Sequence, residues 1–286
     1  PRPPMATIVE AKAIVAKTSF SPQTAPQTRC GLNQAQLPGN SSKGSVFGSH
    51  RHAQTSRAST EGHIASSRPV SLWKRCSDIL CILLSLPITL PSMAVVVLWI
   101  KFVSRGPALF CQERIGRNGK RFVLYKFRSM KMHADTSRHN KHFTHLVRSD
   151  SPMVKLDLIC DSRLIQGGCF LRAAGLDELP QLFNVLRGEM SLVGPRPCLP
   201  EDFALFTPEQ RERFAALPGL TGIWQVYGKG ESTFSEMNAM DALYVRRSSP
   251  GLDFAIMMRT PHALVGQMCK AFQQYRTAHE NLHVAG

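Results

Sequence analysis

The stretch GLDELPQLFNVLRG, residues 175–188, carries the clearest structural signal in this chain. Apolar side chains recur in it at helical spacing and predict one core-facing side of a short helix: Leu179, Leu182, Phe183 and Leu186. Asp177 is a candidate N-cap, Pro180 falls in the first turn, and Gly188 is a candidate C-terminal stop. The stretch therefore predicts a helix that begins near Asp177 and ends before Gly188.

Two adjacent carboxylates, Asp177 and Glu178, lie at the N-terminal end of this predicted helix. The partial positive charge of a helix N-terminus also attracts phosphate groups. Two carboxylates would repel a phosphate unless a cation lay between them, and oxygen ligands beside phosphate favour Mg²⁺. One carboxylate could then bind the metal while its neighbour attacks phosphorus to give an acyl phosphate. From the spacing alone a simpler interpretation is favoured, in which Asp177 caps the helix and Glu178 interacts with its dipole.

Two further segments combine glycine or proline with apolar runs. Ser191–Pro197 predicts an apolar strand that enters a rigid turn and fixes Arg196 between two prolines. A guanidinium held in this way suits bidentate phosphate recognition, although an arginine at a surface turn explains the pattern too. Pro218–Val226 predicts a glycine-marked loop that leads into an apolar strand. Its backbone could approach a ligand closely, or the loop could be a simple turn.

A β-hairpin is predicted earlier in the chain, where the strand-like runs Ala108–Arg114 and Arg121–Phe127 flank the turn pair Asn118-Gly119. The following residues, 131–160, are polar and hard to assign. They contain histidines without the thiolates or carboxylates of a recognisable metal site: His133, His139, His142 and His145. We expect these histidines to lie on a solvated surface.

The run from Ile79 to Ile100 contains no charged residue and is long enough to span a bilayer. Pro87 and Pro91 each remove a backbone donor, so the sequence predicts a kink or break near the middle. Basic residues flank the run on both sides: Lys74 and Arg75 before it, Lys101 and Arg105 after it. Because basic flanks prefer the cytoplasmic side, we expect a re-entrant hairpin, with a kinked transmembrane helix as the open alternative. Carbonyls freed at the break could accept hydrogen bonds from hydroxyl groups of the run: Ser85, Thr89 and Ser92.

Composition narrows the range of partners. The chain has 286 residues, a formal net charge of +15 and 43% hydrophobic residues. This basic balance suits polyanions such as anionic membrane lipid or phosphorylated substrates. No aromatic-basic reader motif supports binding to nucleic acid. The eight cysteines include no CxxC pair, which indicates reduced thiols in a cytosolic setting.

The first 70 residues differ from the rest, because they are rich in Ser, Thr, Gln, His and Pro and contain only Glu10 and Glu61 as acidic residues. Such a stretch buries too little apolar surface to offset its chain entropy, so we expect a disordered basic N-terminal extension. We interpret it as inert, with attraction to anionic lipid as the alternative. A short amphipathic helix could form at Met5–Lys17, and no secretory signal is expected.

Taken together, these segments resemble the bacterial sugar transferase family, the polyprenyl-phosphate phosphoglycosyl transferases with a single membrane hairpin. The resemblance covers about residues 73–262 in the family's order, and it is closest to the short exopolysaccharide-initiating type. The LDELPQ and SLVGPRP segments are together its most specific part. The other matching positions are Lys74-Arg75, Asp78, Gly116, Lys126–Met130, Asp161–Arg163, Leu171-Arg172, Asn184–Gly188, Pro218–Val226, Asp241, Tyr244 and Leu252-Asp253 to Thr260.

The resemblance implies an α-rich α+β fold in a monotopic protein of the bacterial inner membrane that faces the cytoplasm. It divides the chain into a disordered extension at 1–70, a re-entrant membrane helix hairpin at 71–105 and a cytoplasmic sugar-phosphate transferase domain at 106–286. Pro91, or failing that Pro87, matches the break in the family's membrane helix. Amphipathic helices are expected at the membrane interface. Residues 200–216 are one candidate, although a helix facing the core fits them equally well.

The resemblance also implies a two-step transfer. Asp177 matches the family's nucleophile, which attacks the sugar-linked phosphate of a UDP-sugar, expels UMP and forms a phosphosugar-aspartyl intermediate. Undecaprenyl phosphate then accepts the sugar-1-phosphate as the first step of exopolysaccharide synthesis, and the sugar is expected to be glucose or galactose. Glu178 matches the residue associated with Mg²⁺. Five residues are expected to bind the substrate and its phosphates: Arg128, Arg172, Arg196, Gln225 and Lys229.

Some positions depart from the family's pattern and leave sugar preference and efficiency open: Ile165, Cys169, Gly175 and Lys229. A catalytically weak membrane-associated scaffold that binds polysaccharide-assembly proteins is therefore the alternative function. The intact Asp177-Glu178 pair argues against it. Mg²⁺-dependent turnover would separate these two functions, and dependence on detergent would separate both from a basic nucleic-acid-binding protein.

Overall fold

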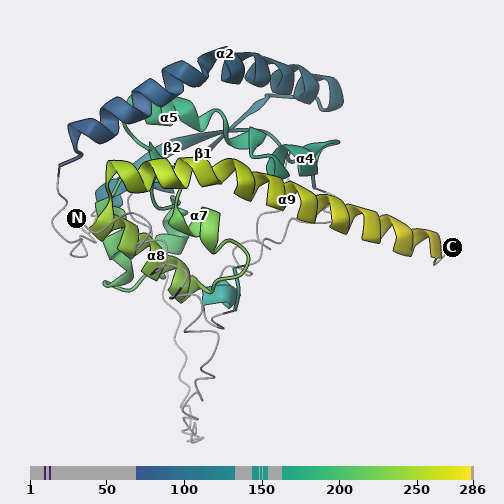
Figure 1. Cartoon of the computed structure of the whole chain (residues 1–286). Helices are drawn as coiled ribbons and strands as arrows, with labels where there is room; N and C mark the ends of the chain where they lie inside the picture. Colours follow the sequence, from purple (N-terminus) through teal and green to yellow (C-terminus); the bar gives the residue numbers. More distant parts are fainter. Residues whose placement is uncertain are drawn as a thin grey trace, which may run out of the picture.

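The computed structural model describes Glu10, Ala13 and residues 69–132, 144–147, 149, 151–153 and 163–284. In this part of the chain, helices surround two small two-stranded sheets, which confirms the expected α-rich α+β class (Figure 1). His145 is exposed, as predicted. The expectations for the N-terminal extension, for the helix at Met5–Lys17 and for His133, His139 and His142 lie outside the described residues, apart from Glu10 and Ala13.

The predicted β-hairpin is present. β1 (Leu109–Ile115) and β2 (Arg121–Phe127) pair antiparallel along their whole length. The 3₁₀ turn η1 (Arg117–Gly119) connects them, with φ values of 58° at Asn118 and 72° at Gly119. Asn and Gly tolerate this left-handed conformation better than other residues, so the local sequence specifies the turn and, through it, the strand register.

The predicted helix at residues 177–187 consists of two elements. A 3₁₀ turn, η2 (Leu176–Glu178), follows the short helix α4 (Gly168–Ala173) and leads into α5 (Gln181–Arg187). Asp177 is therefore not an N-cap, because it lies inside η2, whose N-cap is Gly175 with φ 70°. Gly188 ends α5 with φ 79°, as predicted.

The core-facing side of α5 also differs from the prediction. Leu182 and Val185 are buried, whereas Phe183 and Leu186 are half exposed. A 3₁₀ turn has three residues per turn instead of 3.6, so η2 changes the phase of the helix that follows it. The predicted stripe of Leu179, Leu182, Phe183 and Leu186 assumed one uninterrupted α-helix and was therefore wrong at Phe183 and Leu186.

The second sheet carries the proline-rich turn. β3 (Ser191–Val193) pairs parallel with β4 (Gly219–Thr221), and the turn Gly194–Pro197 follows β3 as predicted. The apolar run after Gly222 was predicted to be a strand, but it forms the helix α7 (Ile223–Tyr227). A short apolar run has too few residues for its periodicity to distinguish a strand from a buried helix.

The predicted amphipathic helix at residues 200–216 is not formed. This segment contains the short helix α6 (Pro200–Phe203) and the 3₁₀ helix η3 (Gln210–Ala215). Phe206 and Phe214 are buried and pack edge-to-face, with ring centroids 5.4 Å apart. The aromatic residues of the segment therefore face the core, which is the second of the two interpretations that its sequence allowed.

The largest hydrophobic core lies between η3, α7, α8 (Phe234–Arg247) and the first turns of α9 (Pro250–Val284). Met240, Tyr244 and Ile256 have at most 1% of their surface exposed. Figure 1 shows α9 as a long helix whose C-terminal half extends beyond the rest of the described chain. One side of α9 exposes large apolar residues: Phe254, Met258, Val265 and Phe272. Contact of such a side with the membrane interface stays a prediction.

The contact between β3 and β4 leaves no space for a side chain at Gly219. A Cβ atom there would lie 2.0 Å from the backbone nitrogen of Gly194 and 2.5 Å from the carbonyl oxygen of Thr221. We therefore expect Gly219→Ala to destabilise the protein by about 1–3 kcal/mol, because backbone atoms cannot rotate away. Gly266→Ala on α9 is the control, since no atom lies within 4 Å of its Cβ position. Thermal unfolding in detergent checks this, and equal midpoints for both variants would contradict it.

The apolar run forms one long helix, α2 (Leu72–Val103), that continues through Pro87 and Pro91. Figure 1 shows α2 bent into an arch over the rest of the described chain, so the expected kink is seen but the helix does not break. Two of the three predicted hydroxyls donate to helix carbonyls, Ser85 to Ile82 at 2.9 Å and Ser92 to Ile88 at 2.7 Å. The third, Thr89, has no hydrogen-bond partner among the described residues.

Both ends of α2 pack closely against the body of the protein, whereas much of its middle is uncovered. Ile82 near the start and Val96 and Ile100 near the end are buried. Large apolar residues between them are more than half exposed: Leu83, Leu84, Ile88, Leu90 and Val95. Among the described helices, α2 alone is long and apolar enough to cross a membrane. The arch therefore presents its uncovered apolar surface between two anchored ends.

The basic residues before the apolar run make specific bonds. Lys74 Nζ donates to Asp253 Oδ2 at 2.6 Å, to the hydroxyl of Tyr244 at 2.8 Å and to the carbonyl of Val193 at 2.9 Å. Arg75 donates to the last carbonyls of α5. Such a cation at a helix C-terminus satisfies orphan acceptors and interacts favourably with the dipole. These bonds join the start of α2 to α5, α8, α9 and β3.

Candidate active site

The two carboxylates of η2 meet basic side chains from distant parts of the chain. Asp177 is buried, with 6% of its surface exposed. One oxygen of Glu178, Oε1, lies 3.3 Å from Lys126 Nζ on β2 and 3.2 Å from Arg196 Nη2 in the turn after β3. The hairpin, η2 and the proline-rich turn therefore converge on one acidic pair.

The electrostatics of Lys126 show how densely this site is charged. Burial lowers the pKa of Lys126 to about 8, and repulsion from Arg196 and Arg114 acts in the same direction. Attraction to Glu178 and Asp177 opposes the shift. Burial is also the largest cause that lowers the pKa of Arg114 to about 10, followed by repulsion from Arg196. Two carboxylates and three cations thus share a poorly solvated site, which suits a substrate with several negative charges.

The acidic pair can be tested as a metal site from its donor atoms. Carboxylate oxygens are hard ligands, and Mg²⁺ commonly takes one or two of them with water and substrate phosphates as its other ligands. No cluster of three or more His, Cys, Asp or Glu residues that could hold a metal exists in the described part of the chain. The residues present therefore fit Mg²⁺ together with a phosphorylated substrate, and they do not form a closed protein cage.

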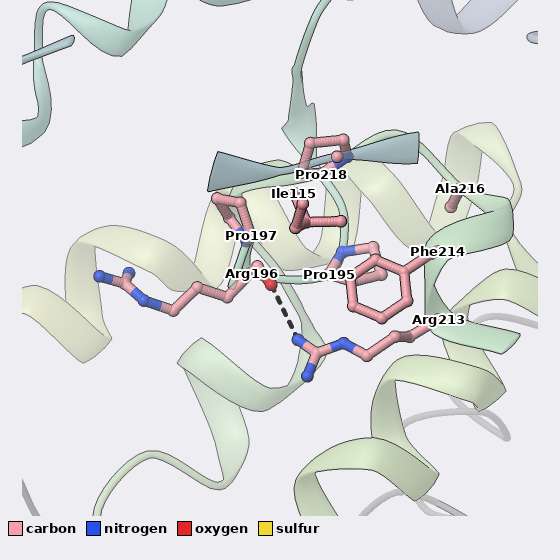
Figure 2. Close-up of a pocket in the computed structure, with 9 residues that line it drawn as sticks. Ile115, Pro195, Arg196, Pro197, Arg213, Phe214, Ala216 and Pro218 are labelled. Carbon is pink, nitrogen blue, oxygen red and sulfur yellow. Dashed lines mark hydrogen bonds between the residues drawn. The ribbon is translucent and has the colours of Figure 1, made fainter. Parts of the chain in front are cut away.

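The turn that carries Arg196 has a second side, which faces a small pocket (Figure 2). Figure 2 shows the guanidinium of Arg196 pointing away from this pocket, while its carbonyl oxygen points toward Arg213. The pocket has a volume of only about 10 Å³, which is room for one water molecule. It is therefore too small to hold a nucleotide or a sugar, and the side of the turn where Arg196 meets Glu178 is the candidate site.

The other expected substrate-binding residues fall into two groups. Gln225 on α7 is 8% exposed, and neither of its amide atoms has a hydrogen-bond partner among the described residues. It lies beside the glycines of the β3–β4 contact, since a Cβ at Gly222 would be 2.6 Å from Gln225 Oε1 and 2.3 Å from the carbonyl of Gly194. Buried polar atoms without partners are uncommon and indicate a position that a ligand or water completes.

Two of the remaining residues, Arg128 and Lys229, donate hydrogen bonds to groups outside the acidic pair. Arg128 donates to the carbonyls of Ser104 and Arg105, at 3.0 and 2.8 Å, just after the end of α2. Lys229 Nζ donates to Gln267 Oε1 on α9 at 2.6 Å. Arg172 lies on α4, which packs against η2. A phosphate-binding role for these three residues stays a prediction.

Sequence reasoning missed Lys126 and Arg114 as site residues. The signal for Lys126 was its place between Tyr125 and Phe127 at the end of an apolar strand. Burial of a charged side chain there costs free energy unless the charge is paired. Arg114 stands four residues before the hairpin turn pair and gave no comparable signal. The contact of Lys126 with Glu178 depends on tertiary packing between β2 and η2.

Comparisons with known proteins show the family to which the chain is similar. The sequence profile of the family described as "Bacterial sugar transferase" matches residues 70–267. The undecaprenyl-phosphate galactose phosphotransferase of Salmonella typhimurium is 38% identical over 195 residues, which are 65% of this chain and 39% of the relative. The UDP-glucose:undecaprenyl-phosphate glucose-1-phosphate transferase of Caulobacter vibrioides is 38% identical over 204 residues, 68% of this chain and 71% of the relative.

A shorter relative covers the chain more evenly. The exopolysaccharide production protein ExoY of Sinorhizobium fredii is 34% identical over 194 residues, which are 68% of this chain and 86% of the relative. Several other curated relatives are much longer, and the matched region spans well under half of their length. The family profile, at residues 70–267, includes α2 and the acidic pair.

Proposed function

The chain belongs to the bacterial sugar transferase family, and from this premise we propose that it transfers a sugar-1-phosphate from a UDP-sugar to undecaprenyl phosphate and releases UMP. One observation carries the proposal: the Glu178 carboxylate lies between Lys126 and Arg196 beside the buried Asp177. This arrangement combines a carboxylate nucleophile with cations for diphosphate oxygens. The names of relatives with galactose and with glucose support a hexose as the sugar.

In the first step of the proposed mechanism, a carboxylate oxygen of Asp177 attacks the phosphorus next to the sugar. The new O–P bond forms as the bond to UMP breaks, and UMP leaves with the electron pair of that bond. Lys126 and Arg196 contact Glu178 of the acidic pair, so their positive charges can stabilise negative charge that moves onto the phosphate oxygens. The product of this step is a phosphosugar-aspartyl enzyme.

In the second step, a phosphate oxygen of undecaprenyl phosphate attacks the same phosphorus. The bond to Asp177 breaks, which regenerates the carboxylate and gives a sugar joined to the lipid by a diphosphate. Glu178 would hold Mg²⁺, which would supply positive charge that reduces the repulsion between the carboxylates and the phosphates. The basic side chains of the site remain in place through both steps, so the reaction needs no reorganisation of these charges.

The proposed reaction places the protein at the inner membrane, where undecaprenyl phosphate and anionic lipid are found. We propose that α2 is re-entrant, with both ends on the cytoplasmic side. Its start is bonded to Asp253 and Tyr244, and its end packs in a core with Phe127 and Leu171. A helix that crossed the bilayer would carry one of these ends away from the body that both of them contact.

Native cysteines can test this topology. Cys76 at the start of α2 and Cys111 on β1 after it are both exposed. In variants that retain one of these two as the only cysteine of the chain, we expect a membrane-impermeant maleimide to label both in inside-out vesicles and neither in intact spheroplasts. Labelling of one cysteine from outside would show a spanning helix instead.

A panel of UDP-sugars tests the function. Protein extracted from membranes in detergent is given Mg²⁺, undecaprenyl phosphate and one UDP-sugar at a time, and UMP release is measured. We expect release with UDP-glucose or UDP-galactose and no release after chelation of the metal by EDTA. Absence of UMP with every donor, in folded protein, would instead support a scaffold of polysaccharide assembly.

Lys126 gives a sharper test of the site. We expect Lys126→Gln to lower kcat/KM by about 10²–10³-fold, because it removes one preorganised cation from a poorly solvated site. Lys120→Gln is the matched control, since Lys120 is an exposed lysine in the same hairpin. Steady-state UMP release for both variants checks this. Equal activity of Lys126→Gln and Lys120→Gln would remove Lys126 from the mechanism.

A further inference from the structure

The turn that carries Arg196 depends unusually on one side chain for its position. Pro195 and Pro197 have no backbone N–H, so neither can donate a hydrogen bond. The carbonyl of Pro195 accepts from the backbone N–H of Gly219 at 2.9 Å, and that of Cys198 accepts from Ile115 at 2.9 Å. Backbone partners therefore hold the two ends of the segment 195–198.

The middle of this segment is held by a side chain instead. Arg213 Nη2 donates to the carbonyl oxygen of Arg196 at 2.8 Å, as Figure 2 shows. Arg213 has only 2% of its surface exposed. A buried guanidinium is rigid and always charged, so it fixes the direction of a carbonyl more firmly than water or a mobile surface residue would.

Arg213 is itself held on several sides. Its Nη2 lies 2.7 Å from Asp241 Oδ2, and its Nη1 donates to Asn238 Oδ1 at 3.3 Å. Its guanidinium also packs over the rings of Phe206 and Phe214, at 5.2 and 5.7 Å from their centroids. Asp241 and Asn238 lie on α8, so a helix of the main core supports the arginine that supports the turn.

We propose that Arg213 is a positioning residue for the transferase site. It fixes the backbone of Arg196, so that the Arg196 guanidinium reaches Glu178 and the substrate phosphates. The proposal rests on the proposed function. Arg213 itself points to the opposite side of the turn from the Arg196 guanidinium (Figure 2), so it acts without touching the substrate. The link therefore runs from Asp241 through Arg213 and the Arg196 carbonyl to the acidic pair.

A double variant separates this role from general stability. Arg213→Met alone would leave Asp241 buried without its cation, whereas Arg213→Met/Asp241→Leu removes both charges, a replacement that buried ion pairs often tolerate. Arg246→Met is the control, because Arg246 lies on the same helix as Asp241 and pairs with Glu212 at the exposed surface. Arg213→Lys keeps the charge without the planar fork and carries the test if the double variant does not fold.

Two readouts decide the proposal. In an otherwise native background we expect the double variant to lower kcat/KM for UMP release at least about tenfold, and in an Arg196→Gln background less than about twofold, since both changes act through one group. By hydrogen exchange and mass spectrometry, the amides of Gly194, Arg196 and Cys198 should exchange faster in the double variant. Arg246→Met should change neither quantity.

The contrary results are equally specific. An equal loss of kcat/KM in both backgrounds would show that Arg213 acts on the whole fold and would overturn the proposal. Unchanged exchange at residues 194–198 would overturn it as well. If the native chain released no UMP from any donor, the proposed function would fail, and the exchange measurement would still decide whether Arg213 positions the turn.

Discussion

Asp177→Asn should lower the rate of UMP release by at least about 10³-fold, which is the largest loss that we expect from any single substitution in this chain. The carboxamide keeps the shape of the side chain but is a poor nucleophile toward phosphorus. Asp177 is 6% exposed and lies in the same charged site as Lys126. A water molecule is therefore badly placed to act as the nucleophile instead of the Asp177 carboxylate. Quenched assays with UDP-glucose and UDP-galactose would measure the loss.

Glu236→Gln is the matched control for this experiment. Glu236 is also a buried carboxylate, with 4% exposed, but it belongs to the capping box at the start of α8, where glutamine serves as well as glutamate. The control should retain nearly full activity and an unchanged unfolding midpoint. Activity of folded Asp177→Asn within about tenfold of the native rate would exclude Asp177 as the nucleophile.

The second large effect is expected at Lys74. Lys74→Met should destabilise the protein by about 3–5 kcal/mol, because it leaves Asp253 and Tyr244 buried without the cation that bonds to both. Burial already raises the pKa of Asp253, and Lys74 opposes that rise. Without the lysine the pKa of Asp253 would rise further. The apparent Tm in detergent should fall by roughly 10 °C.

Lys101→Met tests whether the position of the lysine matters or only its charge. Lys101 flanks the other end of the apolar run, is exposed and makes one hydrogen bond, to the carbonyl of Gly106. We expect its loss to change the Tm by little, since exposed interactions contribute less than about 1 kcal/mol. Equal Tm shifts for Lys74→Met and Lys101→Met would contradict an anchoring role for Lys74. The effect of each lysine would then come only from its positive charge beside the membrane segment.

The sequence predicted the elements that are specified by the residues within them. Asn118-Gly119 specifies its own turn, and the β-hairpin follows from it. Gly188 ends α5 for the same kind of reason, a backbone conformation that glycine adopts easily. In the arch of α2, the two prolines predicted the bend, but the remaining helical hydrogen bonds keep the helix continuous.

Other features depend on tertiary contacts that no local pattern reports. The 3₁₀ turn at Asp177 shifts the phase of α5 and exposes Phe183. The roles of the acidic pair and Arg196 were expected from the family resemblance, and the structure brings Glu178 and Arg196 together. Lys126 and Arg213 were missed, because one belongs to the hairpin and the other to η3, and both reach the site only through packing.

Intact-protein mass spectrometry can distinguish a phosphosugar-aspartyl intermediate from direct transfer between the two substrates. Detergent-extracted protein would be mixed with Mg²⁺ and the donor UDP-hexose, with undecaprenyl phosphate left out. We expect up to one UMP released per protein molecule and a mass increase of one hexose phosphate, which maps to the peptide that contains Asp177 and is absent in Asp177→Asn. UMP release that requires undecaprenyl phosphate, with no adduct on the protein, would contradict this intermediate and show direct transfer between the two substrates.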